Sequence, residues 1–254
     1  MTTLRRWMNW QIEKVLPDPG QSFQRIEPDR VLFEQIDWSA DERVLDVGCY
    51  QGHYARAIAP RVRQVVGLDL DRIALHAASF DDVNALCGDG QSLPFADNSF
   101  DTILCHMTAN LFPRPQVAAR EFVRCCKPDG RVILTVCNLS APYQRVNATL
   151  ERVWPECEWA TVRTSQNRWS ARQWCEAITS HDAKLERTYS CNLCWPLVPR
   201  IRGRWVIPNR VMHSWNQTVR RITGKPLKTD RPHFAAHDYV LVFRKQGRVE
   251  GRAS

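Results

Sequence analysis

Residues 44–53 read VLDVGCYQGH, and this stretch decides the fold of the chain. A short apolar run containing an acid, Asp46, leads through two glycines, Gly48 and Gly52, into a helical pattern. Glycines at such a turn let a ligand approach the backbone closely, because glycine has no side chain and readily adopts a positive φ. A strand, a glycine turn and a helix in this order are typical of a ligand site in an open α/β sheet.

From this stretch onward, short apolar runs alternate with helical patterns, which indicates β-α units and a parallel sheet. The predicted strands cover residues 43–48, 64–70, 83–88, 101–106 and 131–137. Between the last two, Ala118, Phe122, Cys125 and Cys126 follow a helical spacing that stops at a predicted tight turn, Pro128-Asp129-Gly130. We expect an α/β fold similar to the Rossmann fold: doubly wound and mostly parallel, with helices on both faces.

The sequence pattern changes after residue 137. Ser170 and Gln173 have the spacing of a capping box, which predicts a helix over residues 171–179. Strands near 184–193 and 237–244 would complete a seven-stranded sheet. The expected organisation is a helical cap (1–40), a cofactor-binding core (41–137) and a completion of the sheet (138–254) that carries an insert (194–232) as an acceptor-side lobe.

Three predicted strands end next to an acid: Asp46, Asp69 and Asp89. Carboxyl ends of neighbouring parallel strands lie at one edge of a sheet, where ligands usually bind. Asp46 stands just before the glycine turn and suits an amine better than a phosphate. Asp69 is placed to accept from ribose hydroxyls, and Asp89 from an exocyclic amino group such as that of adenine. An amine, a ribose and an adenine together describe S-adenosylmethionine.

The segments DVGCYQG, VVGLDLD, CGDGQSLPFADNSFDTILC and EFVRCCKPDGRVILTV resemble, in order and spacing, the motifs of class I S-adenosylmethionine-dependent methyltransferases. The resemblance covers residues 43–137. It implies that Asp46, Gly48 and Gly52 border the methionine moiety, Asp69 the ribose, Asp89 and Gly90 the adenine, and Cys105 and His106 the sulfonium. Cys49, Tyr50 and Leu70 complete the predicted cofactor contacts. One departure concerns Tyr50, because the family commonly has a glycine at this position.

His106 is the candidate general base, because the fourth strand end would face the methyl group and histidine titrates near neutral pH. The competing interpretation makes His106 a hydrogen-bonded wall residue, and a base is needed only if the acceptor must lose a proton. His53, His233 and His237 are weaker candidates. No metal site is predicted, because Cys191 and Cys194 have no second Cys-x-x-Cys pair at zinc spacing.

The insert concentrates the charge of the chain, whose formal net charge is +8. Trp195, Trp205 and Trp215 flank or enter the basic part of the insert. Cationic and aromatic side chains together suit anionic lipid headgroups, phosphorylated acceptors or nucleic-acid bases. The alternative is a solvated basic surface with tryptophans in its core. Between residues 200 and 231 a single acid, Asp230, accompanies nine basic residues: Arg200, Arg202, Arg204, Arg210, Arg220, Arg221, Lys225, Lys228 and Arg231.

The sequence thus predicts a methyltransferase that acts on a small-molecule or lipid-linked, anionic acceptor, with S-adenosyl-L-methionine as cofactor. The alternatives are an RNA or DNA methyltransferase, and a non-catalytic domain that binds the cofactor or a partner. Nucleic acid is the less favoured partner, because the chain lacks an Asn/Asp-Pro-Pro-aromatic motif. Ten cysteines without a signal peptide or a long apolar run predict reduced thiols and a cytoplasmic location, with peripheral contact to an anionic membrane surface as a further expectation.

Overall fold

The computed structural model describes residues 27–76, 83–138, 167–193 and 236–247, with short pieces at 157–158, 200–201, 204–205, 214–215, 217–219, 221–222 and 228–229. The chain forms two compact units. One comprises Met1–Ile36, Asn138–Thr164 and Tyr189–Tyr239, and the other Asp37–Cys137, Ser165–Thr188 and Val240–Ser254.

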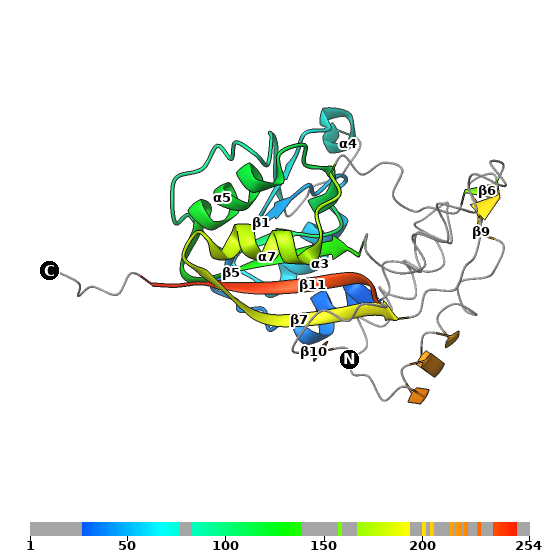
Figure 1. The fold of residues 1–254 in the computed structure, drawn as a ribbon. Helices are drawn as coiled ribbons and strands as arrows, with labels where there is room; N and C mark the ends of the chain where they lie inside the picture. Colours follow the sequence, from blue (N-terminus) through cyan, green and yellow to red (C-terminus); the bar gives the residue numbers. More distant parts are fainter. Residues whose placement is uncertain are drawn as a thin grey trace, which may run out of the picture. The chain divides into compact units, whose positions relative to one another are not determined.

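A single mixed sheet carries the predicted strands, which confirms the expected fold class (Figure 1). Its order is β10-β7-β11-β5-β4-β1-β2-β3. The pairs β1·β2, β1·β4, β2·β3 and β4·β5 are parallel, and β11 runs antiparallel to its neighbours. The strands are β1 (Arg43–Val47), β2 (Gln64–Asp69), β3 (Asn84–Cys87), β4 (Phe100–Cys105), β5 (Cys126–Cys137), β7 (Ala183–Leu193), β10 (Lys228–Thr229) and β11 (Ala236–Lys245).

The central strands carry runs of buried apolar residues because the sheet is covered on both faces. In β1, Val44, Leu45 and Val47 are buried, and in β4 the same holds for Ile103 and Leu104. The strand β3 lies at the edge of the sheet, and its four residues are exposed. The continuous apolar runs of the sequence therefore mark the middle of the sheet.

One part of the sheet differs from the expectation. The predicted tight turn at residues 128–130 lies inside β5, which begins at Cys126 rather than at Arg131. Cys126 pairs with Phe100, and Arg131 pairs with Thr102, so four residues of β5 oppose one residue of β4. Asp129 takes a positive φ of 60° within this irregularity. The glycine and proline signals were thus correctly placed, but they produce a bulge instead of ending the strand.

Two helices pack side by side on one face of the sheet: α5 (Pro115–Cys125) and α7 (Ala171–Thr179) (Figure 1). The capping box of α7 is present as predicted. Ser170 accepts a hydrogen bond from the backbone N–H of Gln173, and the Gln173 side chain accepts one from the backbone N–H of Ser170. The helices α3 (His53–Ile58) and α4 (Arg72–His76) follow β1 and β2.

The predicted N-terminal cap and the insert lie largely outside the described residues. Residues 27–30 are α-helical and continue as a π-helical turn at Val31–Gln35, which buries Val31, Leu32 and Phe33. A small antiparallel sheet joins β6 (Cys157–Glu158), β8 (Arg200–Ile201) and β9 (Arg204–Trp205). The roles assigned to these segments stay predictions. Among the described residues, no helix has the length and apolar character needed to cross a bilayer.

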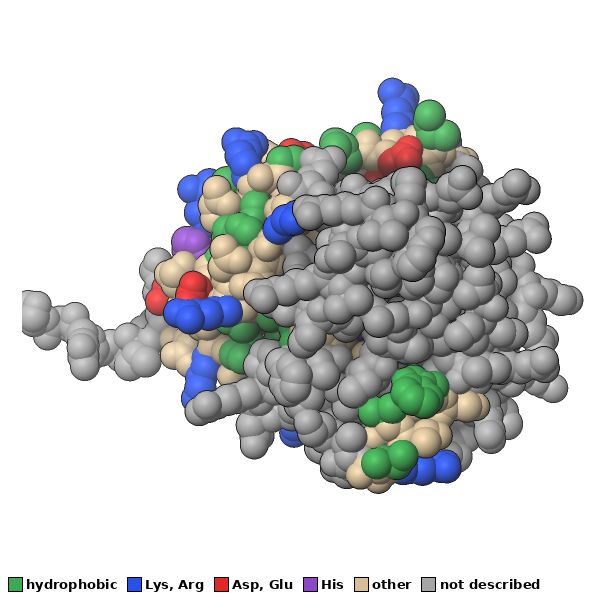
Figure 2. Space-filling view, turned by 45° about the vertical axis from the view of Figure 1, so that its right-hand side comes forward, with side chains coloured by type: hydrophobic (Ala, Val, Ile, Leu, Met, Phe, Trp, Pro, Cys, Tyr) green, Lys and Arg blue, Asp and Glu red, His purple; other side chains and the backbone are tan. Residues whose placement is uncertain are grey.

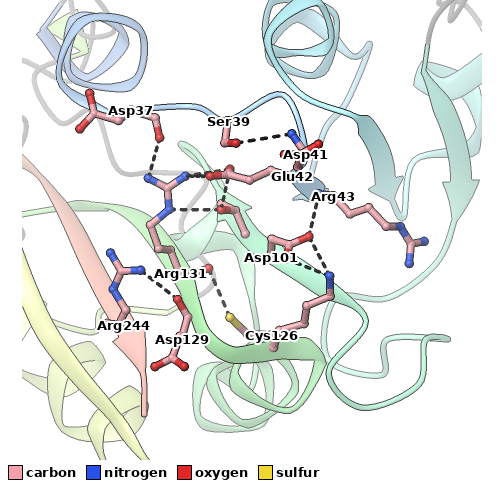
Figure 3. A network of polar contacts seen from close by, with 12 residues as sticks. Asp37, Ser39, Asp41, Glu42, Arg43, Asp101, Cys126, Asp129, Arg131 and Arg244 are labelled. Carbon is pink, nitrogen blue, oxygen red and sulfur yellow. Dashed lines mark hydrogen bonds and ion pairs between the residues drawn. The ribbon is translucent and has the colours of Figure 1, made fainter. Parts of the chain in front are cut away.

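A polar network fixes the end of the sheet opposite the carboxyl ends of the parallel strands (Figure 3). The buried guanidinium of Arg131 donates to both carboxylate oxygens of Glu42, at 2.7 and 2.8 Å, and to the carbonyl oxygen of Asp37, at 2.9 Å. Beside it, Lys127 from the β5 bulge donates to both carboxylate oxygens of Asp101 at 2.9 Å. These contacts tie the segment before β1 to β4 and β5.

We expect Arg131→Ala to lower the free energy of unfolding by about 3 kcal/mol, because Glu42 would keep a partly buried charge without its partner. Chemical denaturation measures the change. As a control, Arg172→Ala breaks the exposed pair Arg172–Glu176 on α7 and should leave the unfolding midpoint unchanged. Equal effects of the two substitutions would contradict the importance of the Arg131 network.

Candidate functional site

The first strand end places Asp46 in a buried position. The side chain is 1% exposed, and the carboxylate accepts a backbone hydrogen bond from Ala55. Its other oxygen, Oδ2, has no hydrogen-bond partner within the described structure. Burial, and after it the charge of Asp69, raises the pKa of Asp46 from 3.8 to about 7. A buried carboxylate with an unused oxygen suits a cationic ligand group.

The turn after β1 has the geometry that the glycines predict. Gly48 has a φ of 79° and Gly52 a φ of 72°. A Cβ at Gly48 would overlap Thr108 Cγ2, so no other residue fits this position without movement. Thr108 also donates its hydroxyl hydrogen to the carbonyl oxygen of Gly48, at 3.1 Å. The backbone N–H groups of Gly48 and Cys49 donate to the carbonyl oxygen of Leu68, which ties the turn to β2.

Tyr50, the departure from the family pattern, has a φ of 50°, in the left-handed region that favours glycine. The position therefore keeps the backbone conformation of a glycine although it carries a large side chain, which is 53% exposed. Its backbone N–H donates to Oδ2 of Asp69 at 2.7 Å. This hydrogen bond holds the residue in the left-handed conformation.

The second and third strand ends lie next to the first. Asp69 accepts hydrogen bonds from the backbone of Tyr50 and, through Oδ1 at 2.8 Å, from that of Asp71. Asp89 is half-buried, and its Oδ1 accepts from the backbone N–H of Gln91 at 2.8 Å. A Cβ at Gly90 would lie 2.7 Å from Val47 Cγ1. The three predicted acids therefore end neighbouring strands at one edge of the sheet.

The predicted contacts from β4 are buried. Cys105 is fully buried, and burial followed by the charge of Asp46 raises the pKa of its thiol, as burial also does for Cys49. His106 is 3% exposed, its Nδ1 lies 2.7 Å from Thr135 Oγ1, and its ring meets that of Tyr54 edge-on with a centroid distance of 4.3 Å. Leu70, by contrast, is 72% exposed.

Of the weaker candidates, His53 lies next to the glycine turn and His237 lies on a different strand. His53 begins α3, where its Nδ1 lies 3.3 Å from Arg56 Nη2. His237 is buried on β11 with Nδ1 2.7 Å from Asp238 Oδ2. His233 lies outside the described residues. Cys191 carries a buried thiol, and its predicted neighbour Cys194 lies outside the described residues.

Sequence reasoning missed three residues that shape this edge of the sheet. Thr108 fills the space beside Gly48, and no sequence motif predicts this contact. Gln91 donates from its side-chain amide to both oxygens of Asp89, at 3.1 and 3.2 Å. Its amide oxygen also accepts from the backbone N–H of Arg114 at 2.8 Å. Gln91 directly follows the acid and glycine of the third strand end, which is the one signal that could have identified it. Asn167, the third, contacts the turn after β4.

Residues 45–134 match the family model described as a methyltransferase domain. The stretch 45–134 is called the methyltransferase domain below because of this match. Its strand order and parallel pairs are those of the class I fold, which confirms the resemblance. The match begins in β1 and ends in β5, so it contains all three acids and the turn after β4.

Curated relatives match less than half of the chain. An uncharacterized methyltransferase of Bacillus subtilis, YcgJ, is 35% identical over 111 residues, which cover 41% of this chain and 44% of that protein. A demethylmenaquinone methyltransferase of Corynebacterium kroppenstedtii is 33% identical over 117 residues, covering 46% of this chain and 50% of the relative. The chain thus spans about half the length of these relatives or less.

Solved structures resemble a larger part of the chain. The structure of YcgJ covers 85% of this chain and 97% of its own, with a TM-score of 0.57 and 22% identity. The structure of the [4+2]-cyclase SpnF covers 90% of this chain and 84% of its own, with a TM-score of 0.54 and 18% identity. At these identities the likeness concerns the fold alone.

We expect Asp46→Asn to stabilise the chain at pH 8 and to weaken binding of S-adenosylmethionine. The folded-state pKa is raised, so the wild type loses stability as the pH rises from about 4 to about 7, and this loss persists above pH 7. The shift corresponds to at most about 4 kcal/mol, and we expect a gain of about 2 kcal/mol because the amide of the introduced asparagine is also a buried polar group.

Denaturation at pH 4 and pH 8 together with calorimetry of cofactor binding measures both effects. A stability difference between the Asp46→Asn variant and wild type that does not grow over this pH range, or unchanged cofactor affinity, would contradict the role of Asp46.

Proposed function

We propose that this chain is an S-adenosylmethionine-dependent methyltransferase that acts on a small-molecule or lipid-linked acceptor. The observation that carries the proposal is the buried carboxylate of Asp46, whose Oδ2 has no partner within the described structure and which shares one sheet edge with Asp69 and Asp89. The match of residues 45–134 to a methyltransferase domain supports it.

The donor set fits S-adenosylmethionine. Oδ2 of Asp46 would accept from the amino group of the methionine moiety, whose positive charge offsets the cost of burying the carboxylate. Asp69 already accepts one backbone N–H at each oxygen and keeps further lone pairs for the ribose hydroxyls, because a carboxylate has about four acceptor positions. Asp89, oriented by Gln91, would accept from the adenine amino group.

When bound, the cofactor supplies an electrophilic methyl group on a sulfonium. The chain then has to align a nucleophile with that methyl group and exclude water, which can account for much of the rate of such a reaction. The buried side chains of Cys105 and His106 at the end of β4 line the predicted transfer position. Their low exposure favours the exclusion of water.

His106 would act as a base in one tautomer only. If its Nδ1–H donates to Thr135 Oγ1, Nε2 is the basic nitrogen. In the other tautomer the threonine hydroxyl donates to Nδ1, and His106 is a wall residue that contacts Tyr54. We propose the first arrangement for acceptors that must lose a proton.

Two measurements test the function. Calorimetry with S-adenosylmethionine and S-adenosylhomocysteine measures binding, and transfer of a labelled methyl group into a small-molecule and lipid extract measures activity. Both are needed, because a [4+2]-cyclase shares this fold. His106→Ala should lower methyl transfer about 100-fold and leave cofactor affinity nearly unchanged. If His106→Ala lowers methyl transfer and cofactor affinity to the same extent, His106 is a cofactor contact rather than a base. If the wild type does not bind the cofactor, the proposed function is wrong.

The relatives suggest the class of acceptor. One is named a demethylmenaquinone methyltransferase and another, from Saccharothrix syringae, a nocamycin O-methyltransferase, which is 33% identical over 116 residues covering 42% of this chain and 41% of that protein. Both names refer to small molecules rather than nucleic acids. We therefore propose a small-molecule acceptor also for this chain.

We further propose that the basic insert contacts an anionic membrane surface from the cytoplasmic side. Trp215 is 50% exposed and Ile222 is 79% exposed, and both belong to helical segments of a strongly basic region. In the lower part of Figure 2, exposed hydrophobic side chains lie beside a basic one. An exposed aliphatic side chain suits the acyl boundary of a lipid surface better than it suits nucleic-acid bases.

The membrane contact predicts that the protein sediments with vesicles of phosphatidylglycerol and phosphatidylcholine, but not with phosphatidylcholine alone, and that salt weakens binding. The double variant Trp215→Ser with Ile222→Ser should bind about tenfold more weakly, because it removes apolar surface. Ile73→Ser, at another exposed position, is the matched control and should bind as wild type. Equal binding to neutral vesicles, or tighter binding to RNA than to vesicles, would contradict this contact.

A further inference from the structure

The turn after β4 borders both glycines of the predicted cofactor site. It consists of Thr108, the 3-10 helix η4 (Ala109–Leu111) and Phe112. At its beginning Thr108 fills the space beside Gly48, and at its end Phe112 Cε1 lies 2.7 Å from where a Cβ at Gly90 would be. One short turn therefore spans from the methionine side to the adenine side of the site.

Asn167 holds this turn from a distant part of the sequence. Its side-chain amide donates to the carbonyl oxygens of Ala109, at 3.0 Å, and of Phe112, at 2.8 Å. Its backbone N–H donates to the carbonyl oxygen of Asn110 at 3.1 Å. Three hydrogen bonds from one buried residue fix the backbone of the whole turn. Such a rigid backbone gives a side chain in the middle of the turn a defined position.

Asn110 is that middle residue, and its amide is incompletely satisfied. The residue is 8% exposed, and its Oδ1 is buried with no hydrogen-bond partner within the described structure. A buried amide oxygen without a partner is unfavourable, and such groups in native proteins call for an explanation such as a bound ligand. An apolar residue at this position would avoid the cost. The position of Asn110 between the contacts to Gly48 and Gly90 points to the ligand of this site.

We propose that Asn110 is a ligand-binding residue whose Oδ1 accepts a hydrogen bond from an N–H or O–H group bound at this edge of the sheet, and that Asn167 is the positioning residue that fixes it. The donor belongs either to the cofactor or to the methyl acceptor. The inference rests on the proposed function, because it takes its ligand from that site. The observations on Asn110 and Asn167 that support it do not involve the three strand-end acids or His106.

Three substitutions separate binding from packing. Asn110→Asp keeps an oxygen that can accept a hydrogen bond, whereas Asn110→Ala and Asn110→Leu remove it. Because the wild-type oxygen has no protein partner within the described structure, Asn110→Leu should have a thermal midpoint no lower than that of wild type. A midpoint well below wild type for the leucine and alanine variants alike would assign Asn110 to packing and overturn the proposal.

Binding of S-adenosylhomocysteine and of adenosine, measured by calorimetry, distinguishes the donors. If the donor is on the nucleoside, Asn110→Ala weakens both ligands about tenfold. If it is the amino group, only S-adenosylhomocysteine is weakened. If it is on the acceptor, both affinities are unchanged and transfer of the labelled methyl group into the extract falls about tenfold. Asn110→Asp, which keeps an acceptor oxygen, should lose less than Asn110→Ala in each case.

The outcomes against the inference are distinct from those against the proposed function. A wild-type chain that binds neither ligand contradicts the proposed function and this inference with it. A wild-type chain that binds and transfers, while Asn110→Ala does both equally well, contradicts the inference alone. As a further check, Asn167→Ala should reproduce the binding defect of Asn110→Ala only in part, because the turn loses its fixed backbone while Oδ1 of Asn110 remains.

Discussion

The burial of one carboxylate, that of Asp46, is the constraint on which the rest of the site depends. Its strand lies in the middle of a sheet covered on both faces, so the side chain is 1% exposed and its pKa rises to about 7. A charged group in this position costs stability unless a ligand offsets the charge. The neighbouring Asp69 adds to the cost through its own charge. A fold that keeps two acids so close at one sheet edge sacrifices stability, which is typical of a site selected for binding.

The sequence predicted the sheet well because its signals are local. Two-sided burial gives β1, β2, β4 and the second half of β5 runs of buried apolar residues. Ser170 and Gln173 start α7 through contacts within one turn of helix. The bulge in β5 was missed because Pro128-Asp129-Gly130 also has the composition of a tight turn. Within the irregular part of β5, Arg131 pairs with Glu42 and Lys127 pairs with Asp101. These partners are far apart in the sequence, so no local pattern predicts them.

The positions of the three acids were predictable for the same reason, because each lies at or just beyond the end of a strand with a buried or apolar run. Their surroundings were not. Nothing in the sequence shows that Thr108 fits against Gly48, or that the Tyr50 backbone adopts the conformation of the glycine it replaces. Tyr50 keeps this conformation while its N–H donates to Asp69. The departure from the family motif therefore changes the side chain at the turn and leaves the backbone path intact.

The methyltransferase domain does not fix the turn after β4 by itself. Its matched residues end at 134, but the turn that borders both glycines is held by Asn167. The position of Asn167 depends in turn on α7: its Oδ1 accepts from the backbone N–H of Trp169, and the next residue, Ser170, caps the helix. The helix α7 packs against α5, and α5 follows the same turn. The turn is therefore held both by the hydrogen bonds of Asn167 and by the packing of these two helices. A segment beyond the shared core thus sets the geometry at the edge where the ligand is expected, and differences in such segments can change the acceptor while the core stays the same.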